Sequence, residues 1–302
     1  MNGLLAADPL VLLARALLAL AALAIVPLGL SAAAPTGEPL TPFYTRLRWV
    51  AGAAGPLVVA TLVLPAGRLA GALAVTWVGV GALSATYGLR RIVSRSGRAR
   101  FDLPSLAIDA GLAYLLVGAA WTWIYRADAT FAGFSGTQAL LTANHFHYAG
   151  FGLCVMVGAL GRVVDPSRIT YRAAAALAVL AVALVALGIT FSHALEVAAA
   201  WTLVLGVLCT AENLVRAGRS ARGAARALFF VSATSGVVAG LFAAHFATSG
   251  FAKLDAGALR RMLLLHGAVN AMGFVGAALL ALRVSTAGER ASRESPTPDA
   301  AR

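Results

Sequence analysis

The sequence predicts an all-α protein, a polytopic bundle of about nine transmembrane helices, and three observations support this prediction. Hydrophobic residues make up 60% of the 302 residues and charged residues only 12%, about half of the roughly 25% found in soluble domains. The mean hydropathy is +0.83. The apolar residues also come in long runs, which match the roughly 20 residues needed to cross a bilayer. We therefore expect a multi-pass protein of the cell membrane, with the lipid bilayer as a partner.

Nine apolar runs define the expected spans. The sixth and seventh runs are nearly continuous, and we divide them at Phe191-Ser192-His193 because together they are about twice as long as one crossing. Residues 1–283 are expected to form a single integral membrane domain. Residues 284–302 are polar and lack apolar periodicity, which predicts a disordered cytoplasmic tail. The nine expected spans are 9–31, 49–66, 69–89, 103–125, 137–160, 173–191, 194–214, 227–249 and 261–283.

Lysine and arginine are unevenly shared between the loops on the two sides of these spans. One side holds 18 of the 24 basic residues and the other side holds 6. Because cytoplasmic loops are enriched in Lys and Arg, this split predicts an external N-terminus and a cytoplasmic C-terminus. The net charge of +12 does not indicate a nucleic-acid partner, since the arginines lie in short loops rather than on one basic face. The richer side comprises the connections 32–48, 90–102, 161–172 and 215–226 and the chain from 283 onward.

The stretch LLTANHFHYAGF, residues 140–151, places two histidines inside an apolar span. The predicted topology puts all five histidines of the protein in the outer half of the membrane. Ionisable groups are costly within lipid, so those inside spans are functional candidates. Glu196 follows His193 by three residues and Asn270 follows His266 by four, spacings that share a helix face. We expect a cavity open to the outer side, lined by Asn144, His145, His147, Tyr148, His193, Glu196, His245, His266 and Asn270.

Two motifs in these spans resemble those of the YndJ-like family of integral membrane proteins. They are TANHFHYAGF at 142–151 and HGAVNAMGF at 266–274. The similarity extends over about 100–283, including IDAGLAYLLVGAAW at 108–121 and the segment 188–196. The resemblance implies a membrane fold with a shared histidine site, and it implies no particular reaction. The positions that match the family motifs are His145, His147, His266 and Asn270.

The spacing of the histidines argues against a metal site formed within one helix. His145 and His147 are two residues apart, or about 200° around an α-helix. Helical metal pairs instead sit at i,i+4, where both rings share a face. The cysteines, Cys154 and Cys209, both lie in apolar runs and indicate neither a disulfide framework nor a zinc site. We therefore predict no cofactor, and the alternatives are a transition metal or a haem held by histidines from two spans.

Neutral histidines suit general acid–base chemistry because they titrate near neutral pH. We expect His147 and His266 to act as acid and base, with His145 orienting the substrate or lining the far side of the cavity. Asn144 and Asn270 complete the expected catalytic set, since amide groups polarise a carbonyl or hold a ring tautomer. The predicted substrate-binding residues are Tyr148, His193, Glu196 and His245.

These residues predict a cofactor-independent isomerase, cyclase or epoxide-opening enzyme that acts on a lipophilic small molecule. A haem- or metal-binding redox protein is the first alternative, and a transporter or non-catalytic membrane protein is the second. The same polar residues also have a structural interpretation, because interhelical hydrogen bonds stabilise membrane bundles by about 0.6–2 kcal/mol each. The sequence leaves the role of Asp109 and the oligomeric state open.

Overall fold

The computed structural model describes residues 8–35, 40–250 and 255–294. Within these ranges the chain is a bundle of long helices, and the only strand-like pairing is an isolated bridge between Phe131 and Phe134. Eight helices are long and apolar enough to cross a membrane. We call a run of helical segments that follow one another end to end a rod. Residues 136–160 form a further rod, which is divided into three shorter helical segments. The protein is therefore an all-α, multi-pass membrane protein, as the sequence predicts.

The observed helices follow the expected spans closely. Three of the rods are subdivided because a π-helical segment, labelled η1, η3 or η5, interrupts the α-helix. In chain order the segments are α2 (Pro9–Leu20), η1 (Ala21–Ile25), α3 (Val26–Ala32), α4 (Pro42–Val63), α5 (Arg68–Ser94), the 3₁₀-helix η2 (Gly97–Phe101), α6 (Leu103–Arg126), α7 (Gly136–His145), η3 (Phe146–Leu153), α8 (Cys154–Leu160), α9 (Ile169–Phe191), α10 (His193–Ser220), α11 (Gly223–Ser249), α12 (Ala256–Met262), η5 (Leu263–Gly276) and α13 (Ala277–Glu294).

The break between the sixth and seventh spans lies where the sequence predicts it. α9 ends at Phe191 and α10 begins at His193. Ser192 between them has an extended backbone, and its hydroxyl accepts a hydrogen bond from the amide of Leu195 at 3.4 Å. Such an N-cap satisfies one of the amide groups that a new helix leaves unpaired.

The two largest differences from the predicted boundaries are at α4 and α13. α4 begins at Pro42 rather than near residue 49, because Thr41 caps the helix and proline is favoured in its first turn. α13 continues to Glu294, so residues 284–294 are helical and the expected disordered tail does not begin at 284. The alanine, glutamate and arginine residues of this segment are strong helix formers, and they extend a helix that has already started. The rest of the expected tail, 295–302, lies outside the described residues.

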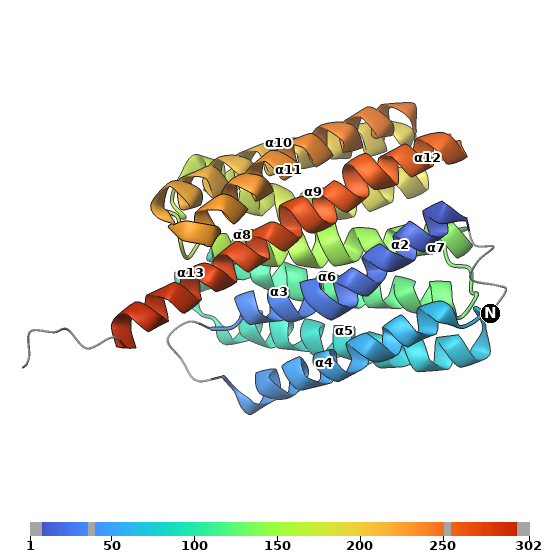
Figure 1. Cartoon of the computed structure of the whole chain (residues 1–302), viewed down its shortest axis with the longest axis horizontal. Helices are drawn as coiled ribbons and strands as arrows, with labels where there is room; N and C mark the ends of the chain where they lie inside the picture. Colours follow the sequence, from blue (N-terminus) through green and yellow to red (C-terminus); the bar gives the residue numbers. More distant parts are fainter. Residues whose placement is uncertain (1–7, 36–39, 251–254, 295–302) are drawn as a thin grey trace, which may run out of the picture.

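The rods form two groups, and the rod α7–η3–α8 forms a central layer between them (Figure 1). α5 packs along α4 and α6 in one group, and α10 packs along α9 and α11 in the other. The rod α7–η3–α8 lies between the groups, since it contacts both α6 and α9. The described ends of the chain lie at opposite ends of the bundle (Figure 1), which fits nine crossings. The arginine distribution remains the basis for predicting which end faces the cytoplasm.

The three π-helical segments η1, η3 and η5 contact one another near the middle of the bundle. π-helical turns hydrogen-bond residue i to residue i+5, are rare, and occur frequently at functional sites. η3 contains most of the motif TANHFHYAGF, and η5 contains all of HGAVNAMGF. The fold therefore brings together the two motifs that the sequence analysis singled out.

Candidate functional site

A cavity of about 570 Å³ opens between the central layer and the helices α9, α10, α11 and η5. Phe131 and Phe191 line its rim and are 61% and 77% exposed. The cavity therefore reaches the surface at the end of the bundle where α9 stops, opposite the connections richest in arginine. Its volume is within the range of roughly 300–1,000 Å³ that is usual for small-molecule sites.

The wall of the cavity is mainly apolar, and a small set of polar side chains interrupts it. Six of the nine residues predicted for the site line the cavity, whereas His147, His193 and His245 do not. The polar lining residues, apart from tyrosine and tryptophan at other positions, are Gln138, Thr142, Asn144, His145, Tyr148, Thr190, Glu196, His266 and Asn270.

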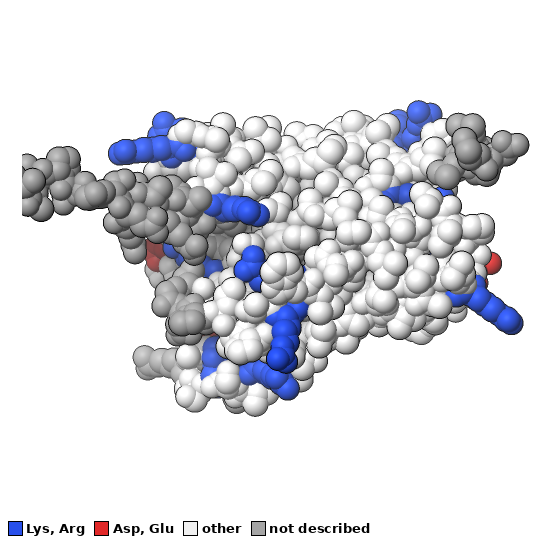
Figure 2. Space-filling model, turned by 60° about the horizontal axis from the view of Figure 1, so that its bottom comes forward, with Lys and Arg blue, Asp and Glu red and all other residues white. Residues whose placement is uncertain are grey.

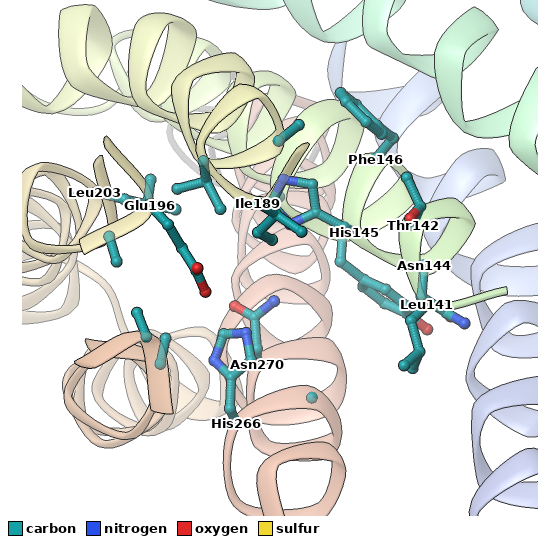
Figure 3. Close-up of a pocket in the computed structure, with 18 of the residues that line it drawn as sticks. Leu141, Thr142, Asn144, His145, Phe146, Ile189, Glu196, Leu203, His266 and Asn270 are labelled. Atoms are coloured by element: carbon teal, nitrogen blue, oxygen red, sulfur yellow. The ribbon is translucent and has the colours of Figure 1, made fainter. Parts of the chain in front are cut away.

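His266 and Asn270 lie four residues apart on η5 and both project into the cavity (Figure 3). The Nδ1 atom of His266 is 2.9 Å from the carbonyl oxygen of Ala239 on α11. Because a carbonyl oxygen only accepts, the proton of the neutral ring belongs on Nδ1. The Nε2 atom of His266 then keeps its lone pair and is the basic nitrogen of this ring.

Glu196 enters the cavity from the first turn of α10. Its carboxylate points toward Asn270 and His266 (Figure 3), and the residue is only 6% exposed. One carboxylate oxygen lies 3.4 Å from Nδ1 of His193. Gly188 on α9 lies against the backbone of Glu196 so closely that any side chain there would collide with it. Glycine at this position therefore allows the α9–α10 hairpin to bring the carboxylate inward.

His145 is the last residue of α7 and faces the cavity from the opposite wall (Figure 3). Its Nε2 atom lies 3.3 Å from the carbonyl oxygen of Val182 on α9. This contact favours a proton on Nε2 and leaves the lone pair on Nδ1. Each of the two cavity histidines thus has one ring nitrogen held by a backbone carbonyl, and the other nitrogen has no hydrogen-bond partner among the described residues.

Asn144 and Tyr148 line the cavity and also fasten the central layer to α2. The amide nitrogen of Asn144 donates to the carbonyl oxygens of Ala14 and Leu140, both at 3.0 Å. The hydroxyl of Tyr148 donates to the carbonyl oxygen of Leu17 at 2.7 Å. The side-chain oxygen of Asn144 is buried and has no hydrogen-bond partner among the described residues. Asn144 therefore has a free acceptor, although its two donors are already used.

His147 points away from the cavity and is fully buried between η3, α5 and α6. Its Nδ1 atom is 2.8 Å from the carbonyl oxygen of Ala143, and its Nε2 atom accepts a hydrogen bond from the indole N–H of Trp77 at 2.9 Å. Both ring nitrogens are thus occupied. This placement does not fit the acid–base role that we predicted for His147, because no lone pair or proton of the ring faces the cavity. The two-residue spacing from His145 is the reason, since it turns the rings to opposite faces.

His193 and His245 lie on the surface rather than in the cavity. The side chain of His193 is 47% exposed. The ring of His245 meets the edge of Phe246, with 5.5 Å between ring centroids, and it is Phe246 that lines the cavity. The predicted substrate-binding role of these two histidines therefore has no support from their positions. His193 acts on the cavity only through its contact with Glu196.

Sequence reasoning missed several polar lining residues, among them Thr190 on α9 and both Gln138 and Thr142 on α7. The spacing of Gln138 and Thr142 relative to His145 could have identified them, because positions 138, 142 and 145 follow one another at intervals of four and three. Such residues share one face of an α-helix. Once His145 is assigned to a cavity wall, the same face predicts both residues.

No group of three or more His, Cys, Asp or Glu side chains within the described ranges is close enough to hold a metal ion. Asp109, whose role the sequence left open, lies outside the cavity in α6. Its buried carboxylate pairs with Arg91, at 2.8 Å, and with Arg95. These contacts join α6 to the C-terminal end of α5 at the arginine-rich end of the bundle.

Comparison with known proteins gives one family and one curated relative. The family described as YndJ-like protein matches residues 16–274, a longer stretch than the 100–283 that the motifs suggested. The uncharacterized membrane protein YndJ of Bacillus subtilis (strain 168) is 31% identical over 180 residues. This match covers 59% of the chain and 32% of the relative, so the chain matches about a third of that protein's length. No solved structure matches the chain.

Proposed function

The chain belongs to the YndJ-like protein family, and we propose that its cavity is the active site of a cofactor-independent acid–base enzyme that acts on a lipophilic small molecule. One observation carries this proposal: a buried carboxylate, two imidazoles and an amide face the same apolar cavity. These groups are Glu196, His145, His266 and Asn270. They come from three different helical rods, so the fold and not local sequence assembles them.

The lining of the cavity supports a lipophilic substrate. Residues such as Val117, Leu141, Ile189 and Leu203 form most of the wall, and an apolar ligand loses little by leaving lipid for such a surface. The exposed phenylalanines at the rim offer an apolar entrance. The polar residues then fix the orientation of the ligand, as a few convergent polar groups do in other small-molecule sites.

The hydrogen bonds of the two histidines support their roles. His266 presents the lone pair of Nε2 and serves as the base that removes a proton from the substrate. Glu196, when protonated, serves as the acid that returns a proton at another atom. The amide of Asn270 donates to an oxygen on which negative charge develops. His145 holds the substrate from the opposite wall. In this proposal His145 keeps the role predicted from the sequence, whereas Glu196 replaces His147 as the partner of His266 in acid–base chemistry.

Isomerisation or cyclisation fits this set because such a reaction returns every proton that it removes. The base takes one proton and the acid delivers one, and transfer between His266 and Glu196 then restores the starting state. Such a cycle needs neither an oxidant nor a reductant. A Soret band or a stoichiometric metal in the purified protein would contradict this cofactor-free proposal and favour the redox alternative.

The test uses purified protein and the total lipid extract of a strain that lacks the gene. We expect the wild type to convert at least one component into a product of equal mass. In D₂O the product of an isomerisation that returns a different proton should carry solvent deuterium. Glu196→Gln and His266→Asn should each slow the conversion by about 10²–10⁴-fold, the usual contribution of a general acid or base.

A matched control separates the cavity from the rest of α10. Glu212 is on the same helix but outside the cavity, where it accepts a hydrogen bond from Thr170 at 2.8 Å and pairs with Arg216. Glu212→Gln makes the same chemical change as Glu196→Gln and should leave conversion unchanged. Conversion that survives both cavity substitutions would show that the chemistry lies elsewhere.

A further inference from the structure

We propose that a second groove, between α3, α4 and α13, binds the phosphate headgroup of an anionic phospholipid. The groove has a volume of about 390 Å³. It lies at the arginine-rich end of the bundle, where α3 ends and α4 begins, and is thus remote from the cavity rim. The proposal therefore does not depend on the proposed enzymatic function. The lining residues are Pro27, Leu30, Ser31, Thr45, Arg48, Trp49, Gly52 and Arg283.

Two guanidinium groups from different helices give the groove its charge. Arg48 comes from α4 and Arg283 from α13, so the fold brings them to one groove from distant parts of the sequence. Arginine is suited to phosphate because its planar fork donates two parallel hydrogen bonds to the oxygens. The hydroxyls of Ser31 and Thr45 add further donors in the same groove. Figure 2 shows basic side chains gathered toward this end of the bundle.

The polarity of the groove changes with depth in a way that matches a phospholipid. Along α4, Thr45 and Arg48 lie nearer the end of the bundle and Gly52 lies deeper. On α3, Ser31 lies nearer the same end and Pro27 lies deeper. The groove is therefore polar where a headgroup would sit and apolar where acyl chains would run.

Two exposed positions on α4 leave room for an acyl chain. Trp49 is 78% exposed, and indole rings favour the level of the headgroups at a membrane surface. A Cβ atom built on Gly52 would meet nothing within 4 Å, so the strip beside it is open. Positions 45, 48, 49 and 52 recur at helical spacing and form one face of α4. Basic pockets between transmembrane helices are known to take anionic headgroups.

Fluorescence of Trp49 provides the test, because brominated acyl chains quench a nearby indole. The full-length protein is reconstituted in dioleoylphosphatidylcholine vesicles with a minor fraction of dibrominated phosphatidylglycerol or of dibrominated phosphatidylcholine. The signal of Trp49→Phe, which keeps the other four tryptophans, is subtracted. We expect stronger quenching by the anionic lipid than by the same fraction of the zwitterionic lipid.

Two kinds of variant test whether lipid binding depends on the charge of the groove and on the open strip beside Gly52. Arg48→Gln and Arg283→Gln should each weaken the preference for phosphatidylglycerol roughly fivefold, and the double variant about thirtyfold. Gly52→Leu fills the open strip without changing charge and should also reduce quenching. The control pair Arg46→Gln and Arg219→Gln removes two charges from exposed residues at the same end but outside the groove, and it should keep most of the preference.

Three results would overturn the proposal. An equal loss of preference in the control pair would mean that diffuse surface charge, and not the groove, attracts the lipid. Equal quenching by both brominated lipids would mean that the groove does not select charge. A Trp49 signal that responds to inorganic phosphate but not to sodium chloride of equal ionic strength, without excess quenching by the anionic lipid, would mean that the groove takes free phosphate rather than a lipid headgroup.

Discussion

His145 and His147 are two residues apart, yet they belong to two different regions of the molecule. His145 faces the cavity, where one ring nitrogen lies 3.3 Å from a backbone carbonyl and the ring meets Phe146 edge-on. His147 lies in the packed interface of η3 with α5 and α6, where both of its ring nitrogens are hydrogen-bonded. Two histidines of one motif in a membrane span can therefore have different roles. One ring is available for a ligand and the other holds helices together.

In the packed interface around His147, unlike around the cavity, neighbouring groups are in close contact. The indole of Trp77 lies nearly parallel to the ring of His147, with 6.0 Å between ring centroids. Gly118 on α6 borders the same ring without any side chain between them. On the other face of the rod, the wall around His145 leaves a cavity of about 570 Å³. We therefore expect substitutions on the packed side to affect stability and those on the cavity side to affect ligands.

The largest effect is expected for His147→Ala. This change removes a buried ring and leaves the indole N–H of Trp77 without its acceptor. Aromatic-to-alanine substitutions in packed cores usually cost about 3–5 kcal/mol, and an unpaired buried donor contributes to such a loss. We expect a clear fall in the unfolding temperature of the purified protein in detergent.

The control for this prediction is Trp77→Phe, which keeps an aromatic ring but removes the donor to His147. It should cost less than His147→Ala, because Nδ1 still bonds to the carbonyl of Ala143. An unfolding temperature of His147→Ala equal to that of the wild type would show that the interface does not depend on this ring.

Much of the bundle is predictable from the sequence because length, hydropathy and charge depend on the bilayer rather than on side-chain packing. The division at Ser192 is an example, since a serine between two long apolar runs can cap a new helix. The extent of α13 was not predictable in the same way, because its last turns are polar and leave the apolar pattern. Helix propensity, not hydropathy, governs that segment.

The site was predictable only in part. Spacing alone showed that His145 and His147 point in opposite directions, but it could not tell which ring faces the cavity. That depends on Trp77, which is 70 residues away from His147 in sequence. The π-helical turns also change the angle between successive side chains, so that an α-helical wheel does not describe η3 or η5. The sequence assigned Glu196 to substrate binding. It could not show that the carboxylate points toward His266, because the two residues lie on different helices that only the fold brings together.

An intermediate effect is expected for Gly118→Ala. A Cβ atom at this position would lie 2.8 Å from Nδ1 of His147, too close for ordinary contact. Because the ring is held at both nitrogens, it cannot move aside without breaking a hydrogen bond. Overpacking of this kind typically costs about 1–3 kcal/mol, which a thermal unfolding curve can measure.

Gly79→Ala on α5 is the matched control for Gly118→Ala. A Cβ atom at Gly79 would meet nothing within 4 Å, and alanine is favoured over glycine within helices by roughly 0.5–1 kcal/mol. The two variants should therefore shift the unfolding temperature in opposite directions. A shift of the same sign in both would mean that the close contact with His147 does not limit this position.

The smallest effect on stability is expected for His145→Ala, although it lies closest in sequence to His147. The ring loses one long contact to a carbonyl and an edge contact with Phe146, and interhelical hydrogen bonds in membranes average about 0.6 kcal/mol. The unfolding temperature should stay near that of the wild type, and conversion of the substrate should fall because the ring faces the cavity. His245→Ala, on the surface and outside the cavity, should leave both stability, within about 0.5 kcal/mol, and conversion unchanged. If His145→Ala instead destabilised the protein as strongly as His147→Ala, both rings would be packing residues, and the division between the two regions would not hold.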